Sequence, residues 1–212
     1  DDVEVVATTG GRPVPGVVLE VVGDDGAPVG PGVVGRVRLR SAAAMRGYVG
    51  DLGAGQLLDA GATASVLDAA GWVTTGDLGA LGEDGNLRLA GRRSEMYIRG
   101  GYNVYPAEVE AVLGEVPGVA QVAVVGTPDP VLGEIGVAFV TLAPGAAVDL
   151  DTVVTACRAR LADYKAPDRL CVVDELPLTA MAKIDKRALA AAAAEAAGRA
   201  PTPRPAKERV TT

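Results

Sequence analysis

Residues 91–110 read GRRSEMYIRGGYNVYPAEVE, and the pattern of the sequence changes within this stretch. A short strand at 96–98 leads into the glycine pair at 100–101. Pro106 then begins a helix, because proline suits the first helical turn and the glutamates behind it suit the positive end of the helix dipole. A strand, a turn and a helix in this order indicate the start of an α+β domain.

The sequence after this stretch continues the same pattern. It predicts strands at 119–125, 136–142 and 170–173, and helices at 151–161 and 186–197. We therefore expect a compact α+β domain over residues 93–197. Residues 198–212 mix Pro, Lys, Arg and Thr with few apolar side chains, which predicts a disordered tail.

The sequence before the stretch reads as short strands separated by turns. Residues 17–22 and 33–39 predict strands, and Asp24-Asp25-Gly26 between them is typical of a hairpin turn. Residues 1–6 indicate an extended segment. We expect residues 1–92 to form a small β-barrel-like subdomain, which makes the whole chain α+β. Because the chain begins with Asp1 instead of methionine, we expect it to be a piece of a longer protein.

The composition excludes several kinds of chemistry. The 212 residues include no histidine and only two cysteines, which excludes Ser-His-Asp and Cys-His catalysis, imidazole-bound metals and thiolate zinc sites. We expect no metal site built by this chain. The net charge of −7 argues against nucleic acid or an anionic membrane as a partner. No apolar run approaches the roughly 18 residues of a membrane span, and no signal peptide begins the chain, so we expect a cytoplasmic location.

Three clusters of residues could carry chemistry. Asp77 follows a Thr-Gly pair at a strand end, where a carboxylate can accept two hydrogen bonds from a sugar diol. The stretch from Arg92 to Gly101 combines cations for phosphate or ribose oxygens with glycines that allow close backbone approach. Lys183 lies among small residues, where its ammonium could reach a carboxylate or phosphate. A turn-forming aspartate, a common glycine turn and a solvent-exposed lysine are the plain alternatives.

In this order and spacing the clusters resemble the C-terminal part of the adenylate-forming superfamily, which includes acyl-CoA ligases, adenylation domains and luciferases. The resemblance runs from about Gly10 to Leu189 and rests on five stretches, residues 35–48, 71–79, 91–110, 164–167 and 177–189. The segment GGYNVYPAEVE within the third stretch is most similar to stand-alone acyl-CoA ligases. The resemblance implies that residues 1–92 end a large AMP-binding domain and that residues 93–197 form a small mobile lid domain.

The resemblance also implies roles in a first half-reaction, which makes an acyl-adenylate from ATP and a small-molecule carboxylic acid. Asp77 would hold the ribose hydroxyls, and Arg92 would assist at the ribose or the phosphates. Lys183 would bridge the substrate carboxylate and the α-phosphate. Mg²⁺ would help to neutralise the charge, with most of the ligands of ATP and Mg²⁺ outside this chain.

A second half-reaction would transfer the acyl group to CoA. Gly100 and Gly101 would line the passage of the pantetheine arm, and Ser94 would be the hinge about which the small domain turns between the half-reactions. The sequence departs from the family at this hinge, which is usually Asp or Lys, and at Ala182, where the family has glycine before the lysine. Extra residues between Tyr48 and Trp72 predict a longer surface loop around 53–61.

We therefore expect the parent protein to be an ATP-dependent acyl-CoA ligase of fatty-acid, aryl or sterol-side-chain metabolism. The family's phosphate loop and substrate-pocket strands lie upstream of this chain. The missing N-terminal part of the same protein is thus an expected partner, and the chain alone is expected to be inactive. An adenylation domain that loads a carrier protein and a non-catalytic α+β binding module are the two alternatives.

Overall fold

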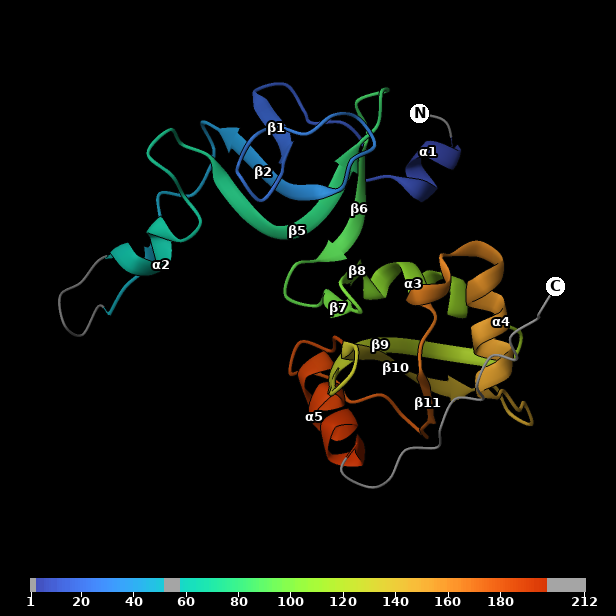
Figure 1. The fold of residues 1–212 in the computed structure, drawn as a ribbon. Helices are drawn as coiled ribbons and strands as arrows, with labels where there is room; N and C mark the ends of the chain where they lie inside the picture. The colour runs from blue at the N-terminus through green and yellow to red at the C-terminus, as the bar shows by residue number, and fades with distance from the viewer. Residues whose placement is uncertain (1–2, 52–57, 198–212) are drawn as a thin grey trace. The chain divides into compact units, whose positions relative to one another are not determined.

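The computed structural model describes residues 3–51 and 58–197, which form two compact units (Figure 1). Unit 1 ends at Ser94, and unit 2 begins at Glu95. Both units combine strands with helices, so the α+β class expected from the sequence is confirmed. The loop expected around 53–61 lies partly outside the described residues, and the tail expected at 198–212 lies outside them entirely.

Unit 1 is built on an antiparallel sheet with the strand order β1-β2-β5-β6. These strands are β1 (Val17–Val22), β2 (Gly35–Ser41), β5 (Val73–Leu81) and β6 (Leu87–Arg92). The smaller elements are α1 (Val3–Thr8), β3 (Tyr48–Val49), β4 (Leu58–Asp59) and α2 (Ala60–Ala64).

The barrel-like form expected for unit 1 is wrong. β1 and β6 are the edges of the sheet, and no pairing joins them in the part of the chain that the structure describes. The sheet is therefore open, because a closed barrel requires its first and last strands to pair. Short strands with frequent turns occur in open sheets and barrels alike, so the sequence pattern could not separate the two. The extended segment expected at residues 1–6 is also wrong, because α1 is helical from Val3.

Unit 2 is a sheet with helices packed on both faces (Figure 1). Its strands are β7 (Tyr97–Arg99), β8 (Tyr102–Val104), β9 (Val119–Asp129), β10 (Gly133–Leu142) and β11 (Arg169–Val172). Its helices are α3 (Pro106–Leu113), α4 (Leu150–Arg160), a short 3₁₀ turn η1 (Asp163–Lys165) and α5 (Lys186–Ala197). The strands and helices expected over residues 93–197 are confirmed, with shifts of a few residues at their ends.

β10 is the central strand of unit 2. It pairs antiparallel with β9 along its length, parallel with β11, and antiparallel with β7 through Gly133. Most of its side chains are buried. Because both faces of the strand are covered, its sequence is a continuous apolar run rather than an alternation of polar and apolar residues.

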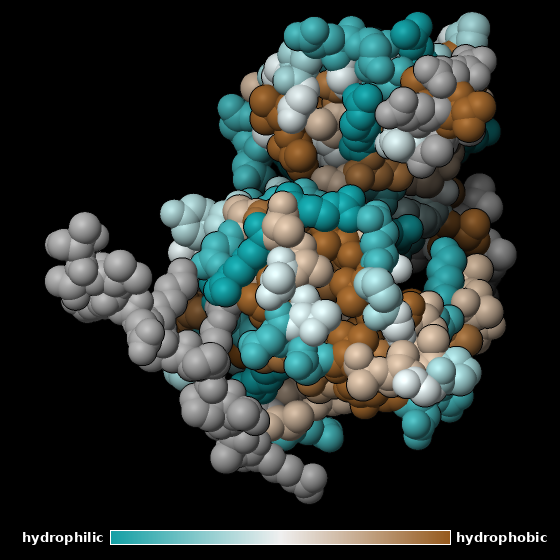
Figure 2. Space-filling model, turned by 90° about the vertical axis from the view of Figure 1, so that its right-hand side faces the viewer, coloured by the Kyte–Doolittle hydropathy of each residue, from teal (hydrophilic) through white to brown (hydrophobic). Residues whose placement is uncertain are grey.

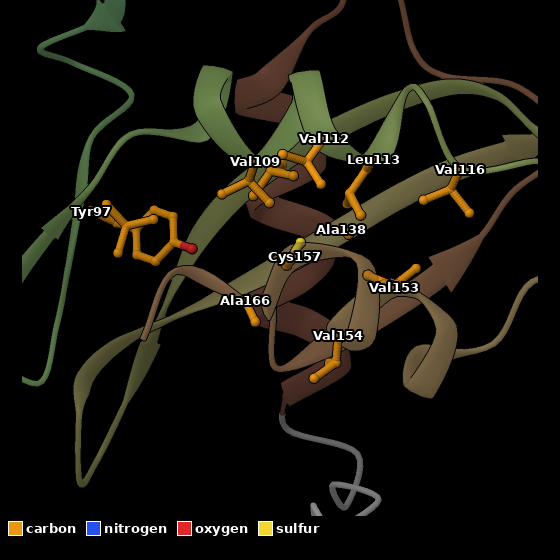
Figure 3. Packing of buried hydrophobic residues seen from close by; sticks show 12 residues of the cluster. Tyr97, Val109, Val112, Leu113, Val116, Ala138, Val153, Val154, Cys157 and Ala166 are labelled. Carbon is orange, nitrogen blue, oxygen red and sulfur yellow. The ribbon is translucent and has the colours of Figure 1, made fainter. Parts of the chain in front are cut away.

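Two hydrophobic clusters lie on opposite faces of β9 and β10. On one face Val124 and Ala138 pack with the buried side chains of α3 and α4 (Figure 3). On the other face Val125 and Phe139 pack with Leu189 of α5. Neighbouring residues of one strand thus point to different clusters, as the two-residue period of a strand requires. This two-sided core is what holds the loops of unit 2 in place.

Candidate functional site

Asp77 and Arg92 lie opposite each other on β5 and β6. Arg92 Nε is 3.5 Å from Asp77 Oδ1, and the two side chains are 61% and 37% exposed, respectively. An ion pair this exposed stabilises a fold by less than about 1 kcal/mol, so either group can turn toward a ligand at little cost. The strand register therefore brings together the two residues that the sequence analysis assigned to the ribose and phosphates.

Thr75 fixes the backbone in front of Asp77. Its hydroxyl donates a hydrogen bond of 2.9 Å to the carbonyl oxygen of Val37 on β2 and accepts one of 3.1 Å from the Asp77 N–H. The register of β5 against β6 shifts directly after Leu78, so Asp77 lies beside a bulge, a feature that re-aims side chains at functional sites. The sequence analysis gave Thr75 no role of its own; the signal was a hydroxyl two residues before the aspartate.

Trp72 anchors the segment that enters β5. The guanidinium groups of Arg38 and Arg40 lie 4.5 and 4.7 Å from the centre of its ring. Arg38 also forms an ion pair of 2.6 Å with Glu20 on β1. Cation–π contacts of this kind contribute about 0.5–1 kcal/mol each at partly exposed sites. They tie the start of the Asp77 strand to β1 and β2.

Gly100 and Gly101 form the two-residue turn between β7 and β8. Their φ angles are +56° and +86°, which fits the type I′ hairpin turn, where both central residues are left-handed and glycine is favoured. The Gly100 N–H donates a hydrogen bond of 2.8 Å to the carbonyl oxygen of Leu132. A side chain added at Gly101 would meet no atom of the described residues within 4 Å, so the tip of the turn presents bare backbone outward.

Both flanks of this turn are anchored to the chain before β11. Arg99 forms two hydrogen bonds with Asp168, of 2.8 and 2.6 Å, and each of these side chains is only 12% exposed. The hydrogen bonds that Arg99 donates to Asp168 raise the pKa of Arg99 above its ordinary value, against the opposite effect of burial. On the other flank the ring of Tyr102 stacks on Tyr164 with their centres 4.6 Å apart. The glycine tip is thus held at both ends.

Lys183 lies on the second arm of a small hairpin, opposite Thr179. Leu178 and Ile184 form an antiparallel bridge at its base. The Thr179 N–H donates to the Lys183 carbonyl oxygen at 2.7 Å, and the Ala182 N–H donates to the Thr179 carbonyl oxygen at 2.9 Å. The Lys183 side chain is exposed and forms no ion pair with any described residue. Its backbone is therefore well held while its ammonium points to solvent.

The candidate residues divide between the two units. Asp77 and Arg92 meet in unit 1, whereas Lys183 and the Gly100-Gly101 turn lie on two loops of unit 2. Ser94 is an exposed turn residue and the last residue of unit 1.

A known protein family matches a large part of unit 2. Residues 108–183, from α3 to the hairpin lysine, match the AMP-binding enzyme C-terminal domain. The chain belongs to the adenylate-forming enzyme superfamily. The resemblance described from the sequence motifs is thereby confirmed.

Named members of the superfamily align with nearly the whole chain. A 3-[(3aS,4S,7aS)-7a-methyl-1,5-dioxo-octahydro-1H-inden-4-yl]propanoyl:CoA ligase of Mycobacterium tuberculosis is 45% identical over 186 residues, which is 88% of this chain and 33% of the ligase. The amide bond synthetase McbA of Marinactinospora thermotolerans is 39% identical, with a TM-score of 0.77 over 88% of this chain and 36% of McbA.

A third relative was solved with a reaction intermediate. The o-succinylbenzoate CoA synthetase MenE of Bacillus subtilis, in complex with the acyl-adenylate OSB-AMP, is 32% identical, with a TM-score of 0.76 over 86% of this chain and 35% of MenE. The chain thus spans about a third of the length of each of these superfamily members.

The donor set suits a nucleotide better than a bare metal ion. The Asp77 carboxylate can accept from a ribose diol, and the Arg92 guanidinium can meet phosphate or hydroxyl oxygens. Within residues 3–51 and 58–197, no group of three His, Cys, Asp or Glu side chains gathers into a metal site.

One cluster in unit 2 was missed by the sequence analysis. Lys186 Nζ lies 2.6 Å from Glu95 Oε2 and 2.8 Å from Glu110 Oε1. Burial acts to lower the pKa of Lys186, but the hydrogen bonds that its ammonium donates to Glu110 and Glu95 outweigh burial and leave the pKa above its ordinary value. These residues are far apart in sequence, so no local pattern could have identified the cluster.

A shallow groove between α3 and α4 lies apart from the candidate residues. Its floor includes Val112, Val116 and Ala156, and Glu115 and Arg160 form an ion pair at its edge. The side of unit 2 that carries α4 shows hydrophobic surface between hydrophilic side chains (Figure 2).

Among the described helices, none is both long and apolar enough to cross a membrane.

Proposed function

We propose that this chain is the C-terminal part of an ATP-dependent acyl-CoA ligase that activates a carboxylic acid and transfers it to CoA. The observation that carries the proposal is the 45% identity over 186 residues with a CoA ligase. The paired Asp77 and Arg92 and the exposed Lys183 supply side chains suited to that chemistry. Because ATP and CoA are intracellular co-substrates, the proposal favours a cytoplasmic location.

In the first half-reaction, an oxygen of the substrate carboxylate attacks the α-phosphorus of ATP, a new P–O bond forms, and pyrophosphate leaves. This step brings two anions together, so the largest help comes from cations placed where the charge gathers. Lys183 is the proposed protein cation, because its exposed ammonium stands on a hydrogen-bonded hairpin. Asp77 and Arg92 are proposed to hold the ribose and phosphates, with Mg²⁺ bound mostly by the nucleotide and by residues outside this chain.

In the second half-reaction, the CoA sulfur attacks the acyl carbonyl carbon, the thiol proton passes to water, and AMP leaves. The backbone at Gly100 and Gly101 is proposed as the surface beside which the narrow pantetheine arm runs, since neither residue has a side chain and the space beside Gly101 is free of other described atoms. We propose that residues 1–92 end the large domain, that residues 93–197 are the small mobile domain, and that Ser94 is the hinge between the half-reactions.

The test uses the full-length parent protein with a panel of carboxylic acids that includes ring-bearing acids. Acid-dependent pyrophosphate release, with CoA thioester formed when CoA is present, is the expected result. Replacement of Lys183 by Ala should slow adenylation by about 10²–10³-fold, as for loss of one electrostatic donor. The same variant should still make thioester from a supplied acyl-adenylate. Arg187→Ala, which removes an exposed cation nearby, is the matched control and should change neither rate.

Three outcomes would contradict the proposal or one of its parts. If no acid of the panel causes pyrophosphate release, the non-catalytic binding module is favoured. CoA thioester formation by the 212-residue chain alone would contradict the expectation that the nucleotide and acyl pockets lie mostly outside it. Loading of a carrier protein without any CoA product would favour the adenylation-domain alternative.

A second candidate is an amide bond synthetase, in which an amine takes the place of CoA. The structural similarity to McbA, with a TM-score of 0.77 at 39% identity, favours keeping it. Both candidates share the adenylation step and differ only in the nucleophile that attacks the acyl carbon. Offering the parent protein CoA and a set of amines in competition, and identifying the acyl product, separates the two.

A further inference from the structure

Lys186 holds together parts of unit 2 that are distant in sequence. It is the first residue of α5, and its ammonium contacts the carboxylates of Glu95 and Glu110 at 2.6 and 2.8 Å. The same Glu110 oxygen also accepts a hydrogen bond of 2.7 Å from the Val124 N–H on β9. The side chains of all three charged residues are between 21% and 31% exposed, so the group is largely shielded from water. One cation therefore joins α5, α3, β9 and the residue that follows Ser94.

The base of the Lys183 hairpin adjoins this group directly in the chain. Asp185, directly before Lys186, accepts hydrogen bonds at Oδ1 from the N–H groups of Arg187 and Ala188, at 3.1 and 3.0 Å. The Asp185 N–H donates 2.8 Å to the carbonyl oxygen of Pro177, which closes the loop from 177 to 185. The hairpin is thus attached to the residue that Glu95 and Glu110 hold.

Stability alone does not account for a lysine at this position. A cation at the N-terminus of a helix is opposed by the helix dipole, which favours negative charge there. Shielding an ammonium and two carboxylates from water also has a desolvation cost that a well-packed apolar side chain would avoid. What the three charges provide and an apolar side chain would not is a defined geometry between α5 and Glu95.

We infer that Lys186 is a positioning residue for adenylation: through Glu95 and Glu110 it sets where the Lys183 hairpin stands relative to the start of unit 2. The inference rests on the proposed function of Lys183. When unit 2 moves at Ser94, the hairpin then moves with it as one body. Without the Lys186 contacts the hairpin can shift, and a displacement of about 1 Å from the reacting groups can cost about 10²-fold in rate.

The kinetic experiment uses the full-length parent protein. Lys186→Met should lower kcat of acid-dependent adenylation about 10–100-fold, while KM for ATP and for the acid changes far less, because the side chain positions a catalytic group and does not hold substrate. Lys186→Arg retains a cation that can bridge two carboxylates and should recover most of the lost rate. The control Arg187→Met removes the neighbouring exposed cation and should leave kcat unchanged. A folded Lys186→Met variant with wild-type kcat overturns the inference.

A second experiment does not depend on activity. In the 212-residue chain, hydrogen exchange is followed at the amides of Thr179, Ala182 and Asp185, which are hydrogen-bonded within the hairpin. Lys186→Met should speed their exchange, and Lys186→Arg and Arg187→Met should not. Unchanged exchange in the Lys186→Met variant overturns the inference. Glu95→Gln weakens the same cluster more mildly and takes the place of Lys186→Met if that variant does not fold.

The two experiments together separate the inference from the proposed function. If the wild-type parent shows no acid-dependent pyrophosphate release, the proposed function fails and the role in adenylation fails with it. Faster hairpin exchange in the Lys186→Met variant would then still establish that Lys186 holds the hairpin. If the wild type is active and both readouts of Lys186→Met match it, only the inference about Lys186 fails.

Discussion

At the scale of single residues, Ala182 has the most unusual backbone in the described part of the chain. Its φ is +56°, and it is the one residue other than glycine in the left-handed region among those described. For a residue with a Cβ this conformation costs about 1–2 kcal/mol. The hydrogen bonds between Thr179 and both Ala182 and Lys183 enforce it. The resemblance noted from the sequence had glycine at this place, and the backbone shows why glycine suits it.

Replacing Ala182 by Gly is expected to stabilise unit 2 by up to about 1 kcal/mol, because the relief of left-handed strain exceeds the added freedom of the unfolded chain. Urea unfolding followed by far-UV circular dichroism measures the change. Ala180→Gly in the same turn is the control: Ala180 has no positive φ, so this change should lower stability. Equal effects of the two substitutions would show that strain at Ala182 is not involved.

At the scale of elements, two glycines make room for one ring. Tyr97 of β7 is 1% exposed, and a Cβ added at Gly126 of β9 or Gly136 of β10 would overlap it. Glycine usually weakens a strand, but here it lets the tyrosine pack against the sheet. The Tyr97 hydroxyl has no hydrogen-bond partner among the described residues, and burial raises the pKa of Tyr97 well above its ordinary value.

Gly136→Ala should destabilise unit 2 by about 1–3 kcal/mol, since its new methyl group would overlap the Tyr97 hydroxyl oxygen. Tyr97→Phe should be neutral or mildly stabilising, because it removes a buried unpaired hydroxyl. In the double variant the two effects should not add: removing the oxygen relieves most of the overlap, which predicts a coupling above about 0.5 kcal/mol. Gly76→Ala in unit 1 is the control, because no atom in the described part of the chain lies within 4 Å of the added Cβ. Strict additivity in urea unfolding would contradict this packing.

At the scale of the whole molecule, hydrogen-bonded carboxylates make stability depend on pH in both units. In unit 1 the Asn86 side chain lowers the pKa of Asp84. In unit 2 the Leu132 N–H lowers the pKa of Asp129, and the Thr152 side chain lowers that of Asp149. A carboxyl whose pKa is lower in the folded state contributes stability above the unfolded value of about 3.8. That stability is lost as the pH falls through the folded pKa.

The double variant Asp129→Asn and Asp149→Asn should therefore lose less stability than the wild type on acidification. One oxygen of each aspartate accepts two hydrogen bonds, so the amide oxygen of asparagine can replace it without titrating. Urea midpoints measured from about pH 5 to pH 2.5 check this. Parallel curves for the two proteins would show that these carboxylates do not account for acid sensitivity.

The sequence by itself determined the order and type of most elements of residues 93–197. The apolar run of β10, the proline at the start of α3 and the glycine pair of the β7–β8 turn are local signals that act within a few residues. The same local motifs were enough to indicate the superfamily. The roles of Asp77, Lys183 and the glycine pair remain predictions that rest on this resemblance.

Only the tertiary structure decided which distant residues meet. The open edge of the first sheet, the pairing of Asp77 with Arg92 and the fit of Tyr97 between two glycines each depend on strand register or packing across elements. The contacts of Lys186 join residues 95, 110 and 186, which no local periodicity connects. Local preferences act over a few residues, whereas these contacts arise only after the chain has closed long loops to form a shared core.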